Sequence, residues 1–201
     1  MNGITPCGDI WFLTGTGTDV GKTVVTAALL RALRDRGVDC QAVKAVQSGC
    51  ARDADGVLRA PDMEEYADAA AGVPVHAPFR FEHPCSPHLA AAAEGRRISA
   101  REVALRVGIL TQEHALTLVE GAGGLLVPIN ESEAVADIVR EFGARVVLVA
   151  ANRLGAINDT LLGLEAAGNR GLAVEAVVFS AAEGDDSPSF LEAAIRRDNI
   201  E

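Results

Sequence analysis

IWFLTGTGTDVGKT, residues 10–23, joins an apolar run to a glycine-rich segment and indicates the fold of the whole chain. Its first four residues are apolar and predict a buried strand that stops at Gly15. Beyond this stretch apolar residues recur at helical spacing, so a helix is expected to begin at Gly21-Lys22-Thr23. The backbone N–H groups of such a glycine-rich turn can point at one spot, which the positive end of the helix dipole also faces. The stretch therefore predicts a phosphate-binding loop.

The spacing of this loop differs from the usual pattern, G-x-x-x-x-G-K-[ST]. Thr16 holds the place of the first glycine, and Gly15 lies one residue further from Gly21. A glycine-rich turn that binds nothing is the alternative interpretation. Because Gly-Lys-Thr opens a helix directly after a buried-type strand, we favour nucleotide binding. Lys22 would then reach the β- and γ-phosphates, and the Thr23 hydroxyl would bind Mg²⁺.

Composition limits the classes of protein to which the chain can belong. With 201 residues, 49% of them apolar, residues 1–201 are expected to form a single domain with a substantial core. The net charge of −10 argues against a nucleic-acid partner, since no basic patch stands out. The four cysteines form no C-x-x-C pair, and we find no signal-peptide pattern and no apolar run of membrane-spanning length. We therefore expect a soluble cytoplasmic protein with reduced thiols.

Hydrophobic periodicity predicts strands that alternate with helices. The expected strands cover residues 10–13, 38–46, 116–119, 145–151 and 174–179. The expected helices cover residues 22–36, 62–71, 89–94, 99–113, 133–142, 155–170 and 189–197, with irregular chain at 50–61 and 73–88. Strands that are apolar throughout are typical of parallel sheets covered on both faces. The predicted fold is α/β: a doubly wound, mainly parallel sheet with helices on both faces, similar to the P-loop NTPases.

Polar residues follow these strands at their carboxyl ends, where such sheets bind ligands. They are residues 16–23, residues 44–48, Glu120 and Asn152. Glu120 precedes a glycine-rich run, so its carboxylate is well placed for Mg²⁺ beside the phosphates; the alternative is a strand-end charge that faces solvent. Lys44 and Lys22 are the only lysines among 18 basic residues. A compact ammonium at a strand end suits a carboxylate, carbamate or phosphate, although a lysine that snorkels from a strand edge shows the same pattern.

Two more polar residues lie near these positions. Ser48 could supply a hydroxyl and backbone donors to the same ligand. Asp62 precedes a helical pattern and has Glu65 at the capping-box position, so the residues alone favour an N-cap role for Asp62. Spacing assigns no role to the four histidines.

Five segments of the chain together resemble those of a known family, the dethiobiotin synthetases. They are GTGTDVGKT at 15–23, KAVQSG at 44–49, FEHPCSPH at 81–88, VEGAGG at 119–124 and LGAIN at 154–158. Their order and spacing agree with the family from about residue 9 to residue 180. Ala45 stands where the family usually has proline.

The resemblance implies an ATP- and Mg²⁺-dependent ligase of biotin biosynthesis, with 7,8-diaminopelargonic acid and CO₂ as substrates. One amine forms a carbamate, the carbamate attacks the γ-phosphate of ATP, and the second amine closes the ureido ring of dethiobiotin. The family also implies a homodimer with shared active sites. Neither nucleic acid nor a membrane is expected as a partner.

The resemblance assigns roles to individual residues. Lys22 and Lys44 match catalytic lysines that neutralise the transferred phosphoryl group and the carbamate. Three residues, Thr23, Asp62 and Glu120, match Mg²⁺ ligands. For Asp62 this ligand role competes with the N-cap interpretation. The matches to the nucleotide site are Gly17, Thr18, Asp19, Val20, Gly21, Lys22, Thr23, Glu120, Gly121 and Gly123. The matches to the substrate site are Thr18, Lys44 and Ser48 and, from the partner subunit, Ala156, Ile157 and Asn158.

The chain departs from the family pattern near its C-terminal end. Ser180 stands where the family usually has an asparagine that reads adenine, and the chain ends at Glu201 without the further strand and helix expected around the base. Weak preference for ATP over other nucleotides is therefore expected. The only tyrosine, Tyr66, does not match the tyrosine with which some members hold the substrate carboxylate.

Two other functions compete with the ligase. The first is a partner-regulated switch ATPase of the Mrp and partitioning-protein kind, but Gly17 stands where those proteins carry a signature lysine. The second is an inactive, degenerate nucleotide-binding protein. The presence of Lys22, Thr23, Lys44 and Glu120 argues against this second possibility.

Overall fold

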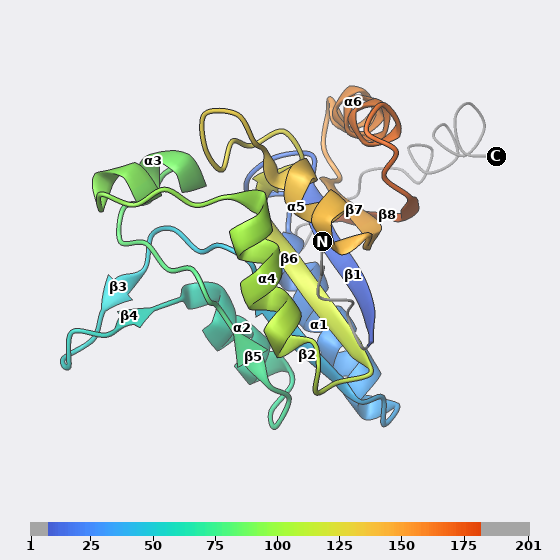
Figure 1. Cartoon of the computed structure of the whole chain (residues 1–201). Helices are drawn as coiled ribbons and strands as arrows, with labels where there is room; N and C mark the ends of the chain where they lie inside the picture. The colour runs from blue at the N-terminus through green and yellow to red at the C-terminus, as the bar shows by residue number, and fades with distance from the viewer. Residues whose placement is uncertain (1–7, 182–201) are drawn as a thin grey trace.

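The computed structural model describes residues 8–181 and is built on a six-stranded sheet with the strand order β5-β2-β6-β1-β7-β8. All neighbouring strands of this sheet are parallel. The strands are β1 (Asp9–Gly15), β2 (Cys40–Lys44), β5 (Val75–His76), β6 (Leu116–Gly124), β7 (Arg145–Ala151) and β8 (Val174–Ser180). Because β1 lies between β6 and β7, the loop that follows β1 opens at the middle of the sheet edge (Figure 1). A separate antiparallel hairpin consists of β3 (Ala51–Arg52) and β4 (Leu58–Arg59).

Helices cover both faces of the sheet. They are α1 (Lys22–Asp35), α2 (Pro61–Ala69), α3 (Pro87–Ala93), α4 (Ala100–Leu110), α5 (Val135–Phe142) and α6 (Ala156–Gly168). Successive residues of β1 point to opposite faces, so Phe12 joins a core with Val103 of α4, whereas Leu13 joins a second core with Val25 of α1 and Tyr66 of α2. Helices α3, α5 and α6 also contribute residues to the first core. The predicted doubly wound α/β fold is confirmed.

Several predicted elements are confirmed closely, notably β7 and α1. The N-cap of α4 is also as predicted, because the Ser99 hydroxyl accepts a hydrogen bond of 3.1 Å from the backbone N–H of Glu102. The predicted helix at residues 189–197 lies outside the described residues. Between residues 8 and 181, no helix is both long enough and apolar enough to cross a membrane.

Three predictions about the bounds of elements are wrong. Strand β6 does not end at Val119, as predicted, but continues to Gly124, since Gly124 pairs with Gly15 of the neighbouring β1. A Cβ atom at Gly124 would lie only 3.0 Å from the carbonyl oxygen of Gly15, so the glycines allow the two strands to stay close. The segment 50–61, predicted as loop, contains the β3–β4 hairpin, and the segment 73–88 contains the short edge strand β5.

The N-cap interpretation of Asp62 is also wrong. Helix α2 begins at Pro61 with Ala60 as its N-cap, and Asp62 lies in the first turn of the helix. Proline at the first helical position is favourable because it has no N–H to leave unpaired. The carboxylate of Asp62 is therefore free to point away from the helix end, and it forms an ion pair with Lys44.

Candidate active site

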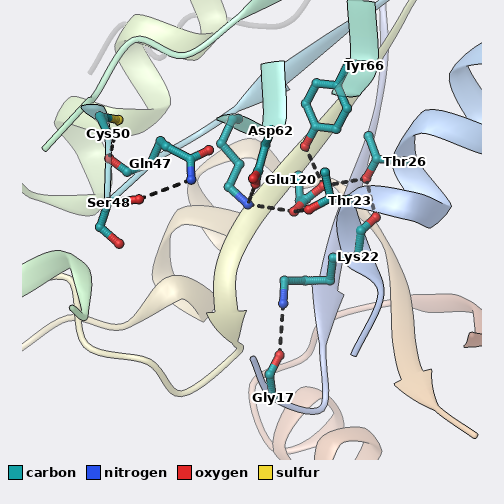
Figure 2. Close-up of polar contacts among 11 residues, drawn as sticks. Gly17, Lys22, Thr23, Thr26, Gln47, Ser48, Cys50, Asp62, Tyr66 and Glu120 are labelled. Atoms are coloured by element: carbon teal, nitrogen blue, oxygen red, sulfur yellow. Dashed lines mark hydrogen bonds and ion pairs between the residues drawn. The ribbon is translucent and has the colours of Figure 1, made fainter. Parts of the chain in front are cut away.

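The loop between β1 and α1 has the backbone conformation of an anion site. Gly21, the N-cap of α1, has φ 89° and Asp19 has φ 56°, both in the left-handed region. Lys22 opens α1, and its Nζ donates a hydrogen bond of 2.9 Å to the carbonyl oxygen of Gly17, so the side chain folds back over the loop (Figure 2). The pKa of Lys22 is lowered, first by burial of a side chain that is only 7% exposed and then by the nearby charge of Lys44. An anion in the loop would relieve both effects.

Glu120 is the centre of the polar network beside this loop. It is fully buried, and both of its carboxylate oxygens are occupied (Figure 2). Oε1 accepts hydrogen bonds from Lys44 Nζ at 2.6 Å and Thr23 Oγ1 at 3.2 Å. Oε2 accepts hydrogen bonds from Tyr66 OH at 2.5 Å and Thr26 Oγ1 at 2.7 Å. The predicted alternative of a solvent-facing Glu120 is therefore wrong.

Lys44 lies between two carboxylates, those of Glu120 and Asp62. It is only 6% exposed, so it does not snorkel to solvent from the strand edge. Burial alone would lower the pKa of Lys44, but the two carboxylates outweigh this effect and raise it. The pKa of Tyr66 is well above its ordinary value because of burial and the adjacent charge of Glu120, so its hydroxyl stays protonated and acts as a donor.

The residues at this position fit a magnesium ion. The Thr23 hydroxyl and the carboxylates of Asp62 and Glu120 are oxygen ligands of the kind that Mg²⁺ prefers, and the two carboxylates already hold one cation, the Lys44 ammonium. Within residues 8–181, no group of three or more His, Cys, Asp or Glu side chains is arranged to hold a metal. Two carboxylates and one hydroxyl leave positions for water and phosphate oxygens, which Mg²⁺ commonly retains.

These side chains open into a cavity of about 720 Å³ at the carboxyl edge of the sheet. The predicted site residues in its lining are Thr18, Asp19, Gly21, Lys22, Thr23, Lys44, Ser48, Asp62, Glu120 and Gly123. Gly17, Val20 and Gly121 lie outside the lining. For Gly121 the structure offers a packing reason, since a Cβ atom there would lie 2.8 Å from the Phe12 ring.

The start of α6 lies outside this cavity as well. Ala156 is buried, whereas Ile157 and Asn158 are exposed and do not contribute to the lining. The structure thus brings the two lysines and the three oxygen ligands together, but it does not bring the α6 residues to the same site within one chain.

Sequence reasoning missed several polar residues of the site. Tyr66 and Thr26 bind Glu120, and each could have been found from helical spacing: Tyr66 follows Asp62 by one turn of α2, and Thr26 follows Lys22 by one turn of α1. Ser86 lines the cavity, and its Oγ lies 3.0 Å from Nδ1 of His88, so one histidine does have a polar partner at the site. Gln47 also lines the cavity, and its Oε1 is buried without a hydrogen-bond partner.

A parallel α/β sheet with a glycine-rich loop, Gly-Lys-Thr at the helix start and a carboxylate on the adjacent strand defines a P-loop nucleotide-binding protein. A family model described as an AAA domain matches residues 10–200. The chain belongs to this family and to the dethiobiotin synthetases, which the following sequence comparisons show.

Curated relatives match most of the chain. An ATP-dependent dethiobiotin synthetase of Anaeromyxobacter dehalogenans is 42% identical over 89% of this chain and 79% of its own length. A second, from Haemophilus influenzae, is 36% identical over 86% of this chain and 91% of its own length. A third, from Chlorobaculum tepidum, is 39% identical over 86% of this chain and 73% of its own length.

Solved structures resemble the fold at low sequence identity. The kinase domain of the Escherichia coli tyrosine kinase ETK superposes with a TM-score of 0.56 at 15% identity, covering 94% of this chain and 72% of the other. A ParA family ATPase from Chlorobium tepidum has a TM-score of 0.56 at 12% identity, covering 94% and 81%. At these identities the likeness concerns the fold alone.

Proposed function

We propose that the chain is an ATP- and Mg²⁺-dependent ligase that closes the ureido ring of dethiobiotin from 7,8-diaminopelargonic acid and CO₂. The observation that carries this proposal is that the only two lysines of the sequence are both buried at one cavity, beside a phosphate loop and three oxygen ligands. A phosphate loop needs one lysine. The second has a separate task, and a carbamate is an anion that a compact ammonium suits. The similarity to ATP-dependent dethiobiotin synthetases supports the same reaction.

In this reaction the chain mainly binds, orients and neutralises charge. An amine nitrogen of the substrate attacks CO₂ and loses a proton, and a carbamate oxygen then attacks the γ-phosphorus as ADP leaves. The second amine attacks the carbonyl carbon and loses a proton as phosphate leaves. Lys44 would neutralise the carbamate, and Lys22 the transferred phosphoryl group. Thr23, Asp62 and Glu120 would hold Mg²⁺, which when bound supplies positive charge beside the phosphates.

The substrate would lie along the cavity wall that follows β2. We assign it the hydroxyls of Thr18 and Ser48, both in the lining, and add Ser86, whose hydroxyl the His88 ring can orient. Backbone groups of Gly17, Val20 and Gly121, which do not line the cavity, complete the proposed nucleotide site.

We also propose a homodimer in which the start of α6 serves the partner's site. Ile157 and Asn158 are exposed, and the neighbouring Leu154 is 99% exposed, so this helix start is available to another chain. A helix N-terminus favours an anion, here the distal carboxylate of the substrate.

We place the protein in the cytoplasm, since Cys40, Cys50 and Cys85 are free thiols. We treat residues 1–201 as one domain, since both cores pack on one sheet.

Phosphate release with MgATP and bicarbonate, with and without 7,8-diaminopelargonic acid, tests the proposed function. We expect release that depends strictly on the diamine. Lys44→Ala should lower this release by about two to three orders of magnitude, because a preorganised charge contact is removed, while ATP still binds. Rapid hydrolysis without the diamine would instead favour a switch ATPase, and no turnover under either condition would favour an inactive binding protein.

A further inference from the structure

The Lys44 ammonium lies between the two carboxylates that are proposed as metal ligands. It contacts Glu120 Oε1 at 2.6 Å and pairs with Asp62 on the other side. Thr23 Oγ1 donates to the same Oε1 of Glu120 at 3.2 Å, so the third proposed ligand is also engaged within the network. In this arrangement, each of the three oxygen ligands already has a hydrogen-bond or ion-pair partner within the chain.

Because the site is buried, the Lys44 ammonium and a metal ion cannot both lie between the carboxylates of Asp62 and Glu120. Glu120 is fully buried and Lys44 is 6% exposed, so water screens their charges weakly. A divalent cation bound between the same two carboxylates would lie within a few ångströms of the ammonium, and two positive charges at that separation repel strongly at low dielectric. The metal and the ammonium therefore compete for the carboxylates of Asp62 and Glu120.

We propose that Lys44 is a resident counter-ion of the metal site: it holds the carboxylates of Asp62 and Glu120 while no metal is bound, and metal binding displaces its ammonium into the cavity. Before displacement the ammonium offsets one of the two negative charges and keeps both carboxylates in place. After displacement the ammonium is available to an anion in the cavity. The metal site is the one assigned under the proposed function, and the last step also rests on that function, in which the anion is the carbamate. Metal loading would then have to precede the use of Lys44.

Removing the ammonium tests this competition directly. Nucleotide-free wild type and Lys44→Met are titrated with Mn²⁺ alone, and the free ion is measured by electron paramagnetic resonance. We expect Lys44→Met to bind one Mn²⁺ at least about tenfold more tightly than wild type, because no charge-assisted hydrogen bond has to be broken. The titration needs neither diamine nor turnover, so its outcome is independent of the test of the ligase function.

Lys22→Met is the matched control. Lys22 is equally long, similarly buried and part of the same cavity, but its Nζ donates to the carbonyl oxygen of Gly17 and not to a carboxylate. We expect its affinity for Mn²⁺ to stay near that of wild type. Equal affinity of wild type and Lys44→Met, or the same gain in both lysine variants, would overturn the proposal, since the second result would reflect only the general loss of positive charge.

A second measurement uses the wild-type protein, because Lys44→Met leaves two carboxylates without their cation and its folding is at risk. Reductive methylation with labelled formaldehyde, read by peptide mass spectrometry, reports each of the two lysines separately. Increasing Mg²⁺ should speed methylation of Lys44, as its ammonium leaves the carboxylates, and should not change Lys22. A Lys44 rate that stays constant throughout the Mg²⁺ titration would contradict displacement.

Discussion

Ser180 packs directly against Gly21: a Cβ atom at Gly21 would lie 2.1 Å from Oγ and 2.7 Å from Cβ of Ser180. Gly21 is the N-cap of α1, and Ser180 is the last residue of β8, at the edge of the sheet. The end of β8 thus forms a wall behind the phosphate loop. Glycine is required at position 21 for two reasons: the backbone has a positive φ there, and Ser180 leaves no room for a Cβ atom.

Gly21→Ala tests this contact. Overpacking against Ser180 should cost about 1–3 kcal/mol in the free energy of unfolding, in addition to the backbone strain at φ 89°. Ser180→Gly removes both clashing atoms, so the double variant should recover the overpacking part and retain only the strain. Denaturant unfolding of wild type, both single variants and the double variant measures the coupling. Additive effects would mean that the two residues do not touch.

Nucleotide preference tests the role of the same serine at the base site. Ser180 holds the position at which the family usually reads adenine with asparagine. The single hydroxyl oxygen of Ser180, packed against Gly21, cannot present a donor and an acceptor on two separate atoms, as a carboxamide does. CTP, GTP or UTP should therefore replace ATP within roughly tenfold in kcat/KM. Initial rates of phosphate release with each nucleotide provide the comparison. Preference for ATP by roughly a thousandfold or more would show that another group reads adenine.

Tyr66→Phe should destabilise the fold by roughly 1.5–3 kcal/mol, since it removes a buried hydrogen bond to a charged oxygen and keeps the ring. Thr26→Val removes the other donor to Glu120 Oε2 and should also lower the free energy of unfolding, because it removes a buried hydrogen bond to the same charged oxygen. Because both donors serve one oxygen, the double variant should lose more than the sum of the two.

Thr111→Val is the control for this pair. Thr111 is also fully buried, but its hydroxyl donates to the neutral carbonyl oxygen of Gly108 at 2.8 Å. Its loss should cost only about 0.5–1.5 kcal/mol. Equal unfolding free energies for Thr26→Val and Thr111→Val would show that the carboxylate adds nothing to the strength of the hydrogen bond.

Thiol labelling should separate the cysteines by burial. Burial raises the pKa of the Cys40 and Cys50 thiols, so their thiolate fractions are small at neutral pH and grow only at higher pH than for an ordinary thiol. Cys85 is half-buried and lines the cavity. In a Cys7→Ser background, iodoacetamide at neutral pH should label Cys85 first, and ligands in the cavity should slow it. Labelling of Cys50 before Cys85 would contradict this assignment.

Subunit exchange tests the shared site. Lys22→Ala and Asn158→Ala should each be nearly inactive, and mixing them at equal concentration should give half mixed dimers, each with one intact site. Activity should then recover to about one quarter of wild type if the sites are independent. Native mass spectrometry verifies the exchange. If the mixture is no more active than the average of the two single variants, the shared-site model fails, and Asn158 is an ordinary helix-start residue within its own chain.

The sequence by itself was enough for the phosphate loop, the alternation of strands and helices, and the family. The signals for the loop and for the elements are local: an apolar run, helical periodicity and a glycine-rich turn all lie within a few residues of one another. For the same reason β7 was predicted at residues 145–151, where the structure has it. The family is recognised from five short segments in their order along the chain. Glu120 and Lys44 were found because polar residues after apolar strands must gather at one edge of a parallel sheet.

Which side chains meet at that edge depends on the three-dimensional packing of the elements. Strands β2 and β6 pair in a register that places Lys44 opposite Glu120, and the packing of α2 beside α1 brings Asp62 and Tyr66 to the same two residues. No local pattern encodes this register. An N-cap and a metal ligand at Asp62 look alike in sequence, because they differ only in the direction of the carboxylate. That direction is set by the ion pair with Lys44, 18 positions earlier in the chain. The contact between Gly21 and Ser180 has the same origin, since it exists only because β7 and β8 pair in parallel beside β1.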